Sequence, residues 1–399
     1  MSLRVAILAA FVVMLVPASA RAQGDGRELR VVQANVGNSN VLGCNDQVFK
    51  LCLRPVEERG AAALRALDPD LVTFQEILPA AICAQAPSPN PFNLCSGPLE
   101  PPSQVVRLLG DGYAETCDDR FGWDCVAARR GRVALGPVAT LPVLDVCADR
   151  GFTVNVGTVR VGGWPIAVTN AHPHSTDAAC RTAQLREMFE RALPAAGPAL
   201  VLGDFNLDPY REDDESVRLW KEKVPSEFRY ASTDAISFAL GPSQLDPTGQ
   251  TLDSGADLVS RCTLDHVVLR GDLHGSCEPQ RIDGGGGMDH LAQVCRISVG
   301  PGAAPRFSLR RRGCTVTARL EPRPAHLEAV EFRAGTRRVL DRRAPFRIRL
   351  RSGARRQTVR AVPQLATGSG PARQARVPAR CAKAAAAPDR GRPAPNFTG

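Results

Sequence analysis

The segment Leu200–Asn206 (LVLGDFN) places the tightest constraint on the fold, because an apolar run ends there in two polar side chains. Residues 200–202 are apolar, Gly203 breaks the run, and Asp204 and Asn206 follow. This pattern predicts a short buried strand. The carboxyl ends of such strands are where α/β proteins place their functional sites. Asp204 and Asn206 are two residues apart, so on an extended backbone their side chains point to the same side.

Five further segments repeat this arrangement of a β-like apolar stretch beside polar residues. They are residues 29–35 (LRVVQAN), 70–76 (DLVTFQE), 166–172 (IAVTNAH), 263–269 (TLDHVVL) and 288–292 (MDHLA). Asp and Asn are also common in ordinary turns, so a single segment of this kind is weak evidence. Six of them in one chain predict a shared site.

The order and the local context of these segments resemble the endonuclease/exonuclease/phosphatase superfamily, the deoxyribonuclease-like proteins. The resemblance covers residues 27–300. It implies an α/β fold, a four-layer α/β/β/α sandwich (DNase I-like). Helical spacing at 56–67 and 181–193, between predicted strands, agrees with this fold. Composition alone indicates only α/β or α+β.

The resemblance also implies a metal-dependent phosphodiesterase. Phosphodiester hydrolysis needs a cation to neutralise charge, an activated water and a proton source. Hard divalent ions prefer oxygen ligands, and the family pattern assigns Asn35, Glu76 and Asp289 as metal ligands. We expect Mg²⁺, with Mn²⁺ or Ca²⁺ as alternatives.

The same resemblance assigns catalytic roles. Asp204 would orient or deprotonate the attacking water, and Asn206 would hold a non-bridging phosphate oxygen. His290 would contact the scissile phosphate, and Asp265 would fix its tautomer, because a catalytic histidine needs an orienting partner. Met288 stands where the family motif has Ser, which removes one hydroxyl and leaves the two chemical groups in place.

A second histidine falls in the third segment. By resemblance His172 is an acid/base or phosphate-contacting residue, and Asp124 is expected as its acidic partner. Pro173 interrupts the strand, so His174 is not expected to share the face of His172. We interpret His266 as a packing residue.

The N-terminus has the layout of a secretory signal peptide. Arg4 precedes an apolar run at 5–16, and small residues offer cleavage sites after Ala20 or Ala22. The run is short for a membrane-spanning helix, although an uncleaved anchor is the alternative interpretation. We therefore expect residues 1–22 to be removed and the protein to be secreted or extracytoplasmic.

The cysteines favour disulfide bonds. The chain has 13 cysteines and none lies within residues 1–22, a usage typical of exported proteins. Close neighbours in loop-like sequence are expected to pair: Cys44 with Cys52, Cys83 with Cys95, and Cys117 with Cys125. Cys314 and Cys381 bracket the final domain. The odd number leaves one thiol free or in an intermolecular pair.

The charge is distributed unevenly. Residues 301–399 carry 23 Lys and Arg against 5 Asp and Glu, whereas the preceding residues carry 27 against 36. The basic segment is interpreted either as a solvated surface from a composition-biased genome or as an anchor for polyanions or anionic surfaces.

This basic segment also has its own predicted fold. After a Pro- and Gly-containing boundary at 301–305, alternating patterns predict strands at 314–320, 329–333, 337–340, 346–351 and 357–362. They favour a small all-β sandwich that resembles bacterial immunoglobulin-like modules. The expected domains are a signal peptide at 1–22, a catalytic domain at 27–300, a basic immunoglobulin-like module at 306–382 and a disordered tail at 383–399.

The sequence therefore favours a secreted phosphodiesterase that acts as a monomeric extracellular nuclease. A sphingomyelinase or phospholipase C-type esterase is the alternative, since Asn170, His172 and His174 resemble that branch. A phosphomonoesterase and a non-catalytic secreted binding protein are further alternatives. Substrate choice is expected to depend on loops at 83–95 and 207–262.

Overall fold

The computed structural model describes the chain from residue 28 to residue 377, with gaps. The described residues are 28–37, 53–85, 87–118, 123–142, 147, 153–161, 163–194, 197–240, 260–282, 289–299, 307–312, 315–320, 329–343, 346–351, 357–365, 368–369 and 372–377. The expected signal peptide, Met288 and the expected tail at 383–399 lie outside these residues.

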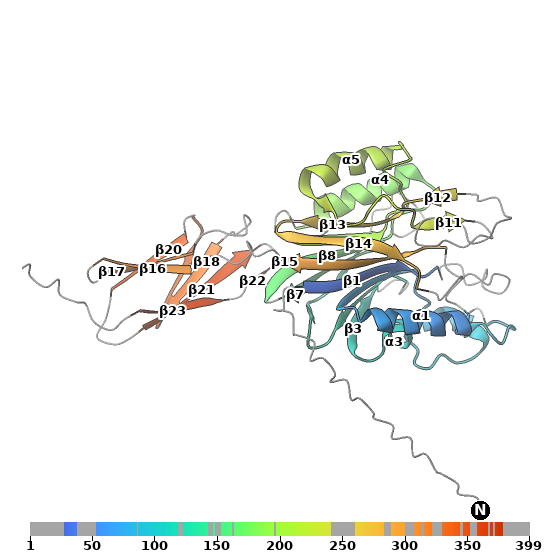
Figure 1. Cartoon of the computed structure of the whole chain (residues 1–399), viewed down its shortest axis with the longest axis horizontal. Coiled ribbons are helices and arrows are strands. Elements are labelled where there is room, and N and C mark those ends of the chain that lie inside the picture. The colour runs from blue at the N-terminus through green and yellow to red at the C-terminus, as the bar shows by residue number, and fades with distance from the viewer. Residues whose placement is uncertain are drawn as a thin grey trace, which may run out of the picture.

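Two mixed β-sheets pack face to face and carry helices on their outer sides (Figure 1). The first has the order β14-β15-β1-β2-β4-β3. Its strands are β14 (Leu273–Gln280), β15 (Ala292–Val299), β1 (Glu28–Asn35), β2 (Leu71–Gln75), β4 (Cys125–Arg129) and β3 (Tyr113–Cys117). Together with the second sheet and the two helical layers, it confirms the predicted four-layer sandwich.

The second sheet has the order β10-β13-β9-β8-β7-β5, and β6 pairs with β7. Its strands are β10 (Arg229–Tyr230), β13 (Asp265–Arg270), β9 (Ala199–Asp204), β8 (Trp164–Ala171), β7 (Thr153–Val161), β5 (Ala134–Leu135) and β6 (Ala139–Pro142). A small pair, β11 (Phe238–Leu240) with β12 (Ser260–Cys262), lies beside it.

One parallel pair in each sheet positions the site. Strand β1 runs parallel to β2, and β8 runs parallel to β9. Parallel neighbours bring their carboxyl ends to the same edge of a sheet. Each pair therefore delivers two strand ends to the same region between the layers.

Helices cover both outer faces (Figure 1). On the first sheet lie α1 (Arg54–Leu67) and α3 (Gln104–Leu109), with the shorter α2 (Ala80–Gln85) and η2 (Leu94–Ser96) nearby in the chain. On the second lie α4 (Ala178–Glu187), its π-helical continuation η4 (Met188–Ala192), and α5 (Glu215–Glu227). The predicted helices at 56–67 and 181–193 are confirmed as α1 and as α4 with η4.

Helix α5 corrects the prediction that residues 207–262 form a loop. The Asp214 side chain accepts hydrogen bonds from the Val217 amide and the Ser216 hydroxyl, which caps the helix start. Val217, Trp220 and Val224 are buried at helical spacing. The helical pattern is obscured in the sequence by Pro225 and by the many charged residues on the exposed face.

Three apolar cores separate the layers. The inter-sheet core includes Val31, Leu71, Val168 and Leu202, each fully buried. The first sheet packs its other face against its helices, for example through Leu64 in α1. The second sheet does the same, for example through Trp220 in α5. Among the described residues, no helix has both the length and the apolar character to cross a membrane.

Four disulfide bonds lie within the described residues: Cys83–Cys95, Cys117–Cys125, Cys147–Cys180 and Cys277–Cys295. The first two confirm predicted pairs, and the last two were not predicted because their partners are distant in sequence. Cys117 lies directly opposite Cys125 across β3 and β4, and Cys277 lies opposite Cys295 across β14 and β15. Strands β3 and β14 are the two edges of the first sheet. The other four expected cysteines, Cys44, Cys52, Cys314 and Cys381, lie outside the described residues.

The C-terminal part is all-β. One sheet contains β16 (Phe307–Arg312), β17 (Thr315–Leu320) and β20 (Phe346–Arg351). The other contains β19 (Arg337–Asp341), β18 (Ala329–Ala334), β21 (Gln357–Leu365), β22 (Gly368–Ser369) and β23 (Arg373–Val377). The predicted strands are confirmed, whereas the immunoglobulin-like likeness remains a prediction. Figure 1 shows these sheets beyond β22, apart from the helical layers.

Candidate active site

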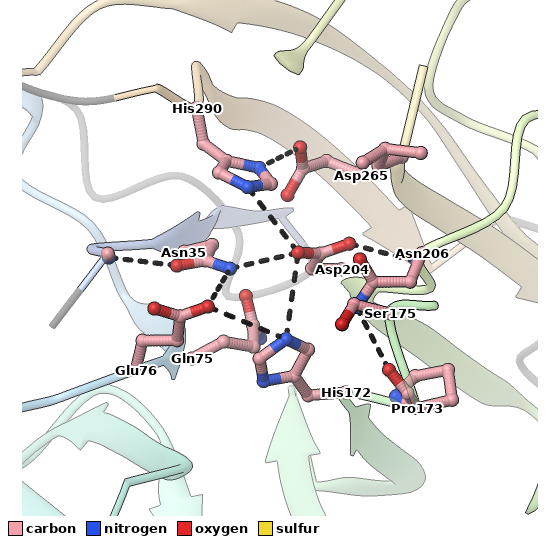
Figure 2. Close-up of polar contacts among 12 residues, drawn as sticks. Asn35, Gln75, Glu76, His172, Pro173, Ser175, Asp204, Asn206, Asp265 and His290 are labelled. Atoms are coloured by element: carbon pink, nitrogen blue, oxygen red, sulfur yellow. Dashed lines mark hydrogen bonds and ion pairs between the residues drawn. The ribbon is translucent and has the colours of Figure 1, made fainter. Parts of the chain in front are cut away.

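Four strand ends from the two parallel pairs converge on one polar cluster (Figure 2). Asn35 ends β1 and Glu76 follows β2. His172 follows β8, and Asp204 ends β9. His290, just before β15, joins them from the first sheet's side. The structure therefore brings together side chains that the sequence pattern predicted to share one site.

The Asp204 carboxylate lies at the centre of the cluster and is buried (Figure 2). Its Oδ2 accepts a hydrogen bond from Asn35 Nδ2 at 2.9 Å. The same oxygen lies 3.5 Å from His290 Nε2 and 3.7 Å from His172 Nε2. Its Oδ1 accepts from the Asn206 backbone N–H at 2.9 Å. Each of these four neighbours therefore presents an N–H group or a cationic ring to this carboxylate.

A glycine allows β8 and β9 to approach this closely. Gly203 has φ +154°, and it lies opposite Ala171 in the parallel register. A Cβ built on Gly203 would lie 1.9 Å from the Ala171 carbonyl oxygen. Because His172 and Asp204 directly follow these two residues, the missing side chain sets their separation.

Two site residues have left-handed backbones. Glu76 has φ +58° and Asn206 has φ +51°. Non-glycine residues adopt this region rarely, at a cost on the order of 1–3 kcal/mol each, and they cluster at functional sites. The left-handed turns end each strand abruptly and direct the Glu76 and Asn206 side chains toward the cluster.

His290 is oriented by a buried carboxylate. Its Nδ1 lies 2.8 Å from Asp265 Oδ2, and the other Asp265 oxygen accepts from Gln33 Nε2 at 2.8 Å. This contact assigns the Nδ1 proton to the side facing Asp265, which leaves Nε2 directed at Asp204. The Phe238 ring packs against the imidazole at 4.8 Å between ring centroids.

His172 has its own acidic neighbours. Its Nδ1 lies 3.6 Å from Asp124 Oδ1, and its Nε2 lies 3.8 Å from Glu76 Oε1. Its side chain is 20% exposed, against 6% for His290. His172 is therefore the more accessible of the two histidines to a substrate group.

Both imidazoles favour the charged form. Burial opposes the charge on His172, but the carboxylates of Asp124, Asp204 and Glu76 outweigh it and raise its pKa to about 9. For His290, Asp265, Asp204 and Asp289 likewise outweigh burial and raise the pKa to about 10. These histidines are suited to hold protons near a phosphate.

For the carboxyl group of Asp204, burial outweighs the neighbouring positive charges and hydrogen-bond donors. Burial raises the pKa of Asp204, and nearby Asp265 adds to this, while His290, His172 and Asn35 oppose it. A raised carboxyl pKa brings the group toward the range in which it can accept a proton from water.

The donor set fits a divalent cation of the hard type. Glu76 is 15% exposed, so its carboxylate can face a ligand. One buried oxygen of Asp289, Oδ1, has no hydrogen-bond partner in the described structure, and such an atom is the kind that a cation satisfies. Asn35 directs Nδ2 at Glu76 and Asp204, and its Oδ1 accepts from the Gly37 amide.

A second group of donors is tighter but already satisfied. Asp204, Asp265 and His290 place one ligand atom each within 4.8 Å of one another. However, Asp265 is bonded to both His290 and Gln33. The carboxylate of Asp265 in this trio is therefore already engaged in hydrogen bonds.

The remaining predicted residues are also placed. Asn206 Nδ2 donates to the Pro173 carbonyl at 2.9 Å, which leaves one amide N–H for a ligand. His174 lies outside the cluster, since its Nδ1 accepts from the Thr176 and Asp177 amides. His266 packs against Trp220 and contacts Leu207, as expected of a core residue.

The sequence analysis missed a buried polar layer beneath the cluster. Gln33 Nε2 donates to Gln75 Oε1 at 2.7 Å as well as to Asp265, and Gln75 Nε2 donates to Asn170 Oδ1 at 2.5 Å. These amides link the two sheets. Their signal was available, because Gln33 lies two residues before Asn35 and so shares its face of the strand.

Comparison with known proteins places this chain in a family. The site consists of a buried carboxylate between two histidines, at the ends of two facing parallel strand pairs. A sequence model of the Endonuclease/Exonuclease/phosphatase family matches residues 39–287. This match covers more than half of the chain, and the chain belongs to that family. Membership supports hydrolysis of phosphoric esters.

Solved structures are similar at low identity. An endonuclease/exonuclease/phosphatase from Beutenbergia cavernae is 18% identical, with a TM-score of 0.46, over 88% of this chain and 100% of its own. One from Bacteroides vulgatus is 13% identical, with a TM-score of 0.49, over 68% and 99%. D. rerio TDP2 complexed with a single strand DNA product is 17% identical, with a TM-score of 0.46, over 68% and 99%. No curated protein sequence matches the chain.

Proposed function

We propose that the protein is a secreted, divalent-metal-dependent phosphodiesterase that acts on nucleic acid as an extracellular nuclease. The observation that carries this proposal is the Asp204 carboxylate, which lies between His172 and His290 and is held by Asn35. One buried base beside two cationic acids provides the proton acceptor and the proton donors that phosphodiester hydrolysis requires.

The chain's residues divide the chemistry among them. Asp204 takes a proton from the attacking water, and Asn35 and the Asn206 backbone hold that carboxylate in place. His290, oriented by Asp265, stabilises charge on the phosphate. His172, charged beside Asp124, is the candidate donor to the leaving oxygen because it is the more exposed ring.

A cation completes the site. Glu76 and Asp289 would hold it, with Asn35 adjacent, and Mg²⁺ is the ion we expect, ahead of Mn²⁺ or Ca²⁺. When bound, such an ion neutralises charge on the phosphate and polarises its oxygens. Asn206 has one amide N–H left to contact a non-bridging oxygen.

Export is supported by the disulfides. Four of them lie within the described residues, and stable disulfides are characteristic of oxidising compartments. The signal peptide at 1–22 and the monomeric state remain part of the proposal. The basic C-terminal sheets would hold a polyanionic substrate that the acidic catalytic part repels.

The test is cleavage of plasmid DNA by the mature protein with Mg²⁺ and with EDTA. We expect nicking with Mg²⁺, none with EDTA, and none with Asp204→Asn, which keeps the size of the side chain but removes its charge. If the folded protein does not nick DNA, sphingomyelin and small phosphate esters are tested next. Activity of Asp204→Asn close to that of the native protein would refute its role as the base.

A further inference from the structure

We propose that the outer face of the sheet β16-β17-β20 binds duplex nucleic acid through its phosphates, without reading sequence. This arginine face is formed by the side chains that alternate with the buried ones on the three strands. Its members with described side chains are Ser308, Arg310, Thr315, Thr317, Arg319, Arg347 and Arg349. The choice of polymer depends on the proposed function, whereas the existence of an anion-binding face does not.

The strand register arranges these side chains in rows. Ser308, Arg319 and Arg347 are neighbours in one row. In the next row Arg310 and Arg349 flank Thr317. Alternate residues on a strand are about 6.7 Å apart, and strands about 4.8 Å apart. The guanidinium groups are therefore several ångströms apart in both directions, so one phosphate backbone that crosses the face can contact more than one of them.

The opposite side of the same strands is apolar and buried. Ala318, Phe346, Ile348 and Leu350 are at most 5% exposed. This burial fixes the orientation of the sheet, because a register slip would turn the arginines into the core. The face is therefore a defined surface and not a set of independently placed charges.

Within the described residues, the arginines of this face form no ion pair with an acidic side chain. The three strands contain no Asp or Glu. In the described residues of the C-terminal sheets, Glu331 pairs with Arg333 and Arg338 on the other sheet, and Asp341 accepts from the backbone N–H of Arg347. Arg319 Nε is buried without a hydrogen-bond partner in the described structure. The charge of the exposed guanidinium groups on this face is therefore available to phosphates.

The composition of the face selects among polyanions. Its described side chains are guanidinium and hydroxyl groups only. Binding of unpaired bases uses aromatic stacking, and insertion into a lipid surface uses apolar side chains. A duplex hides its bases and exposes phosphates, which arginine contacts with two parallel N–H groups.

The location of the face implies a long ligand. The C-terminal sheets contact the catalytic part where Arg160 Nη1 donates to the Ser369 carbonyl at 2.7 Å, beside the turn between β7 and β8. Strand β8 runs from that turn to His172 and contains eight residues, about 26 Å at 3.3 Å per residue. A duplex that reaches from the active site to the face must therefore exceed roughly 8 base pairs.

The experiment measures binding of the full chain in EDTA, so that no hydrolysis occurs. The affinity for a duplex of 30 base pairs and for one of 8 is measured as salt is varied. The test variant carries Arg310→Gln, Arg347→Gln and Arg349→Gln. The control carries Arg342→Gln, Arg360→Gln and Arg376→Gln, three exposed arginines outside the face, and has the same net charge.

We expect the face variant to lower the slope of log affinity against log salt by about 2–3, because each phosphate contact contributes about 0.9. The control should retain the native slope. Equal losses in both variants, or no loss in the face variant, would overturn the proposal and leave the arginines as solubilising charges. If the triple variant does not fold, Arg310→Gln and Arg349→Gln are tested singly, and an unchanged slope in both overturns it.

Two further measurements separate the possible failures. Vesicles containing phosphatidylserine test the lipid alternative, and loss of vesicle binding with intact duplex binding in the face variant would overturn the nucleic-acid assignment. Hydrolysis of bis(p-nitrophenyl) phosphate in Mg²⁺ should be equal in both variants. If the native chain hydrolyses no ester but the face variant still loses duplex binding, the proposed function fails and this inference stands.

Discussion

Replacing Gly203 with alanine should damage both the stability and the activity, because one atom is added where two strands meet. The new Cβ would lie 1.9 Å from the Ala171 carbonyl oxygen and 2.9 Å from its carbon. Real Cβ atoms do not approach within 3.0 Å, so β8 and β9 must separate by roughly 1 Å.

Two costs add in this variant. The backbone at φ +154° is one that L side chains rarely adopt, at a cost on the order of 1–3 kcal/mol. Overpacking adds about 1–3 kcal/mol. We therefore expect the free energy of unfolding to fall by about 2–6 kcal/mol. The displacement also separates His172 from Asp204, and a shift of about 1 Å in a catalytic group can cost about 10²-fold in rate.

The assay combines urea unfolding with hydrolysis of bis(p-nitrophenyl) phosphate in Mg²⁺. Gly131→Ala is the matched control, since Gly131 also has a positive φ, +79°, but nothing lies within 4 Å of its would-be Cβ. It should lose only the backbone cost, about 1–2 kcal/mol, and keep its activity. If Gly203→Ala loses no more stability than Gly131→Ala and keeps the native rate, the close approach does not set the site geometry.

Three further results are expected. Asp265→Asn should lower kcat on the order of 10³-fold or more with little change in fold, because His290 loses the partner that fixes its tautomer; a native kcat would contradict this. The pKa values of His172 and His290 are raised to about 9 and about 10. Their contribution to stability in EDTA is therefore fully present below about pH 6.5 and is lost as the pH rises through 9 to 10. Urea unfolding at pH 6, 8 and 10 should show that decline. Asp124→Asn should lower the pKa of His172, measured by NMR titration, and an unchanged titration would exclude Asp124 as its partner.

The strand ends of the site were predictable because each carries a local signal. Asp204 closes an apolar run, and the other polar strand ends repeat that pattern, so elementary periodicity located them. The family resemblance then supplied their roles. The alternation of arginine with apolar residues at 346–351 similarly predicted which face of β20 is buried, and Arg347 and Arg349 are exposed.

Other features depend on contacts between distant segments. The sequence places Gln33 on the same face as Asn35, but its contact with Asp265 spans 232 residues of chain, and no local pattern identifies that partner. The disulfide Cys147–Cys180 joins partners 33 residues apart, beyond any local rule. Helix α5 was missed because tertiary packing of Trp220 and an Asp214 cap, and not propensity, stabilise it. The positive φ angles of Glu76 and Asn206 are likewise imposed by the assembled site.

The disulfides of the first sheet have a consequence for how the molecule withstands its surroundings. Edge strands are normally where a sheet frays and where proteases or other chains gain access. Here both edge strands, β3 and β14, are joined covalently to their inner neighbours at directly opposed residues. Neither edge can detach alone, so opening of this sheet requires disruption of the central strands as well. Durability against digestion is thereby built into the borders of the catalytic layer.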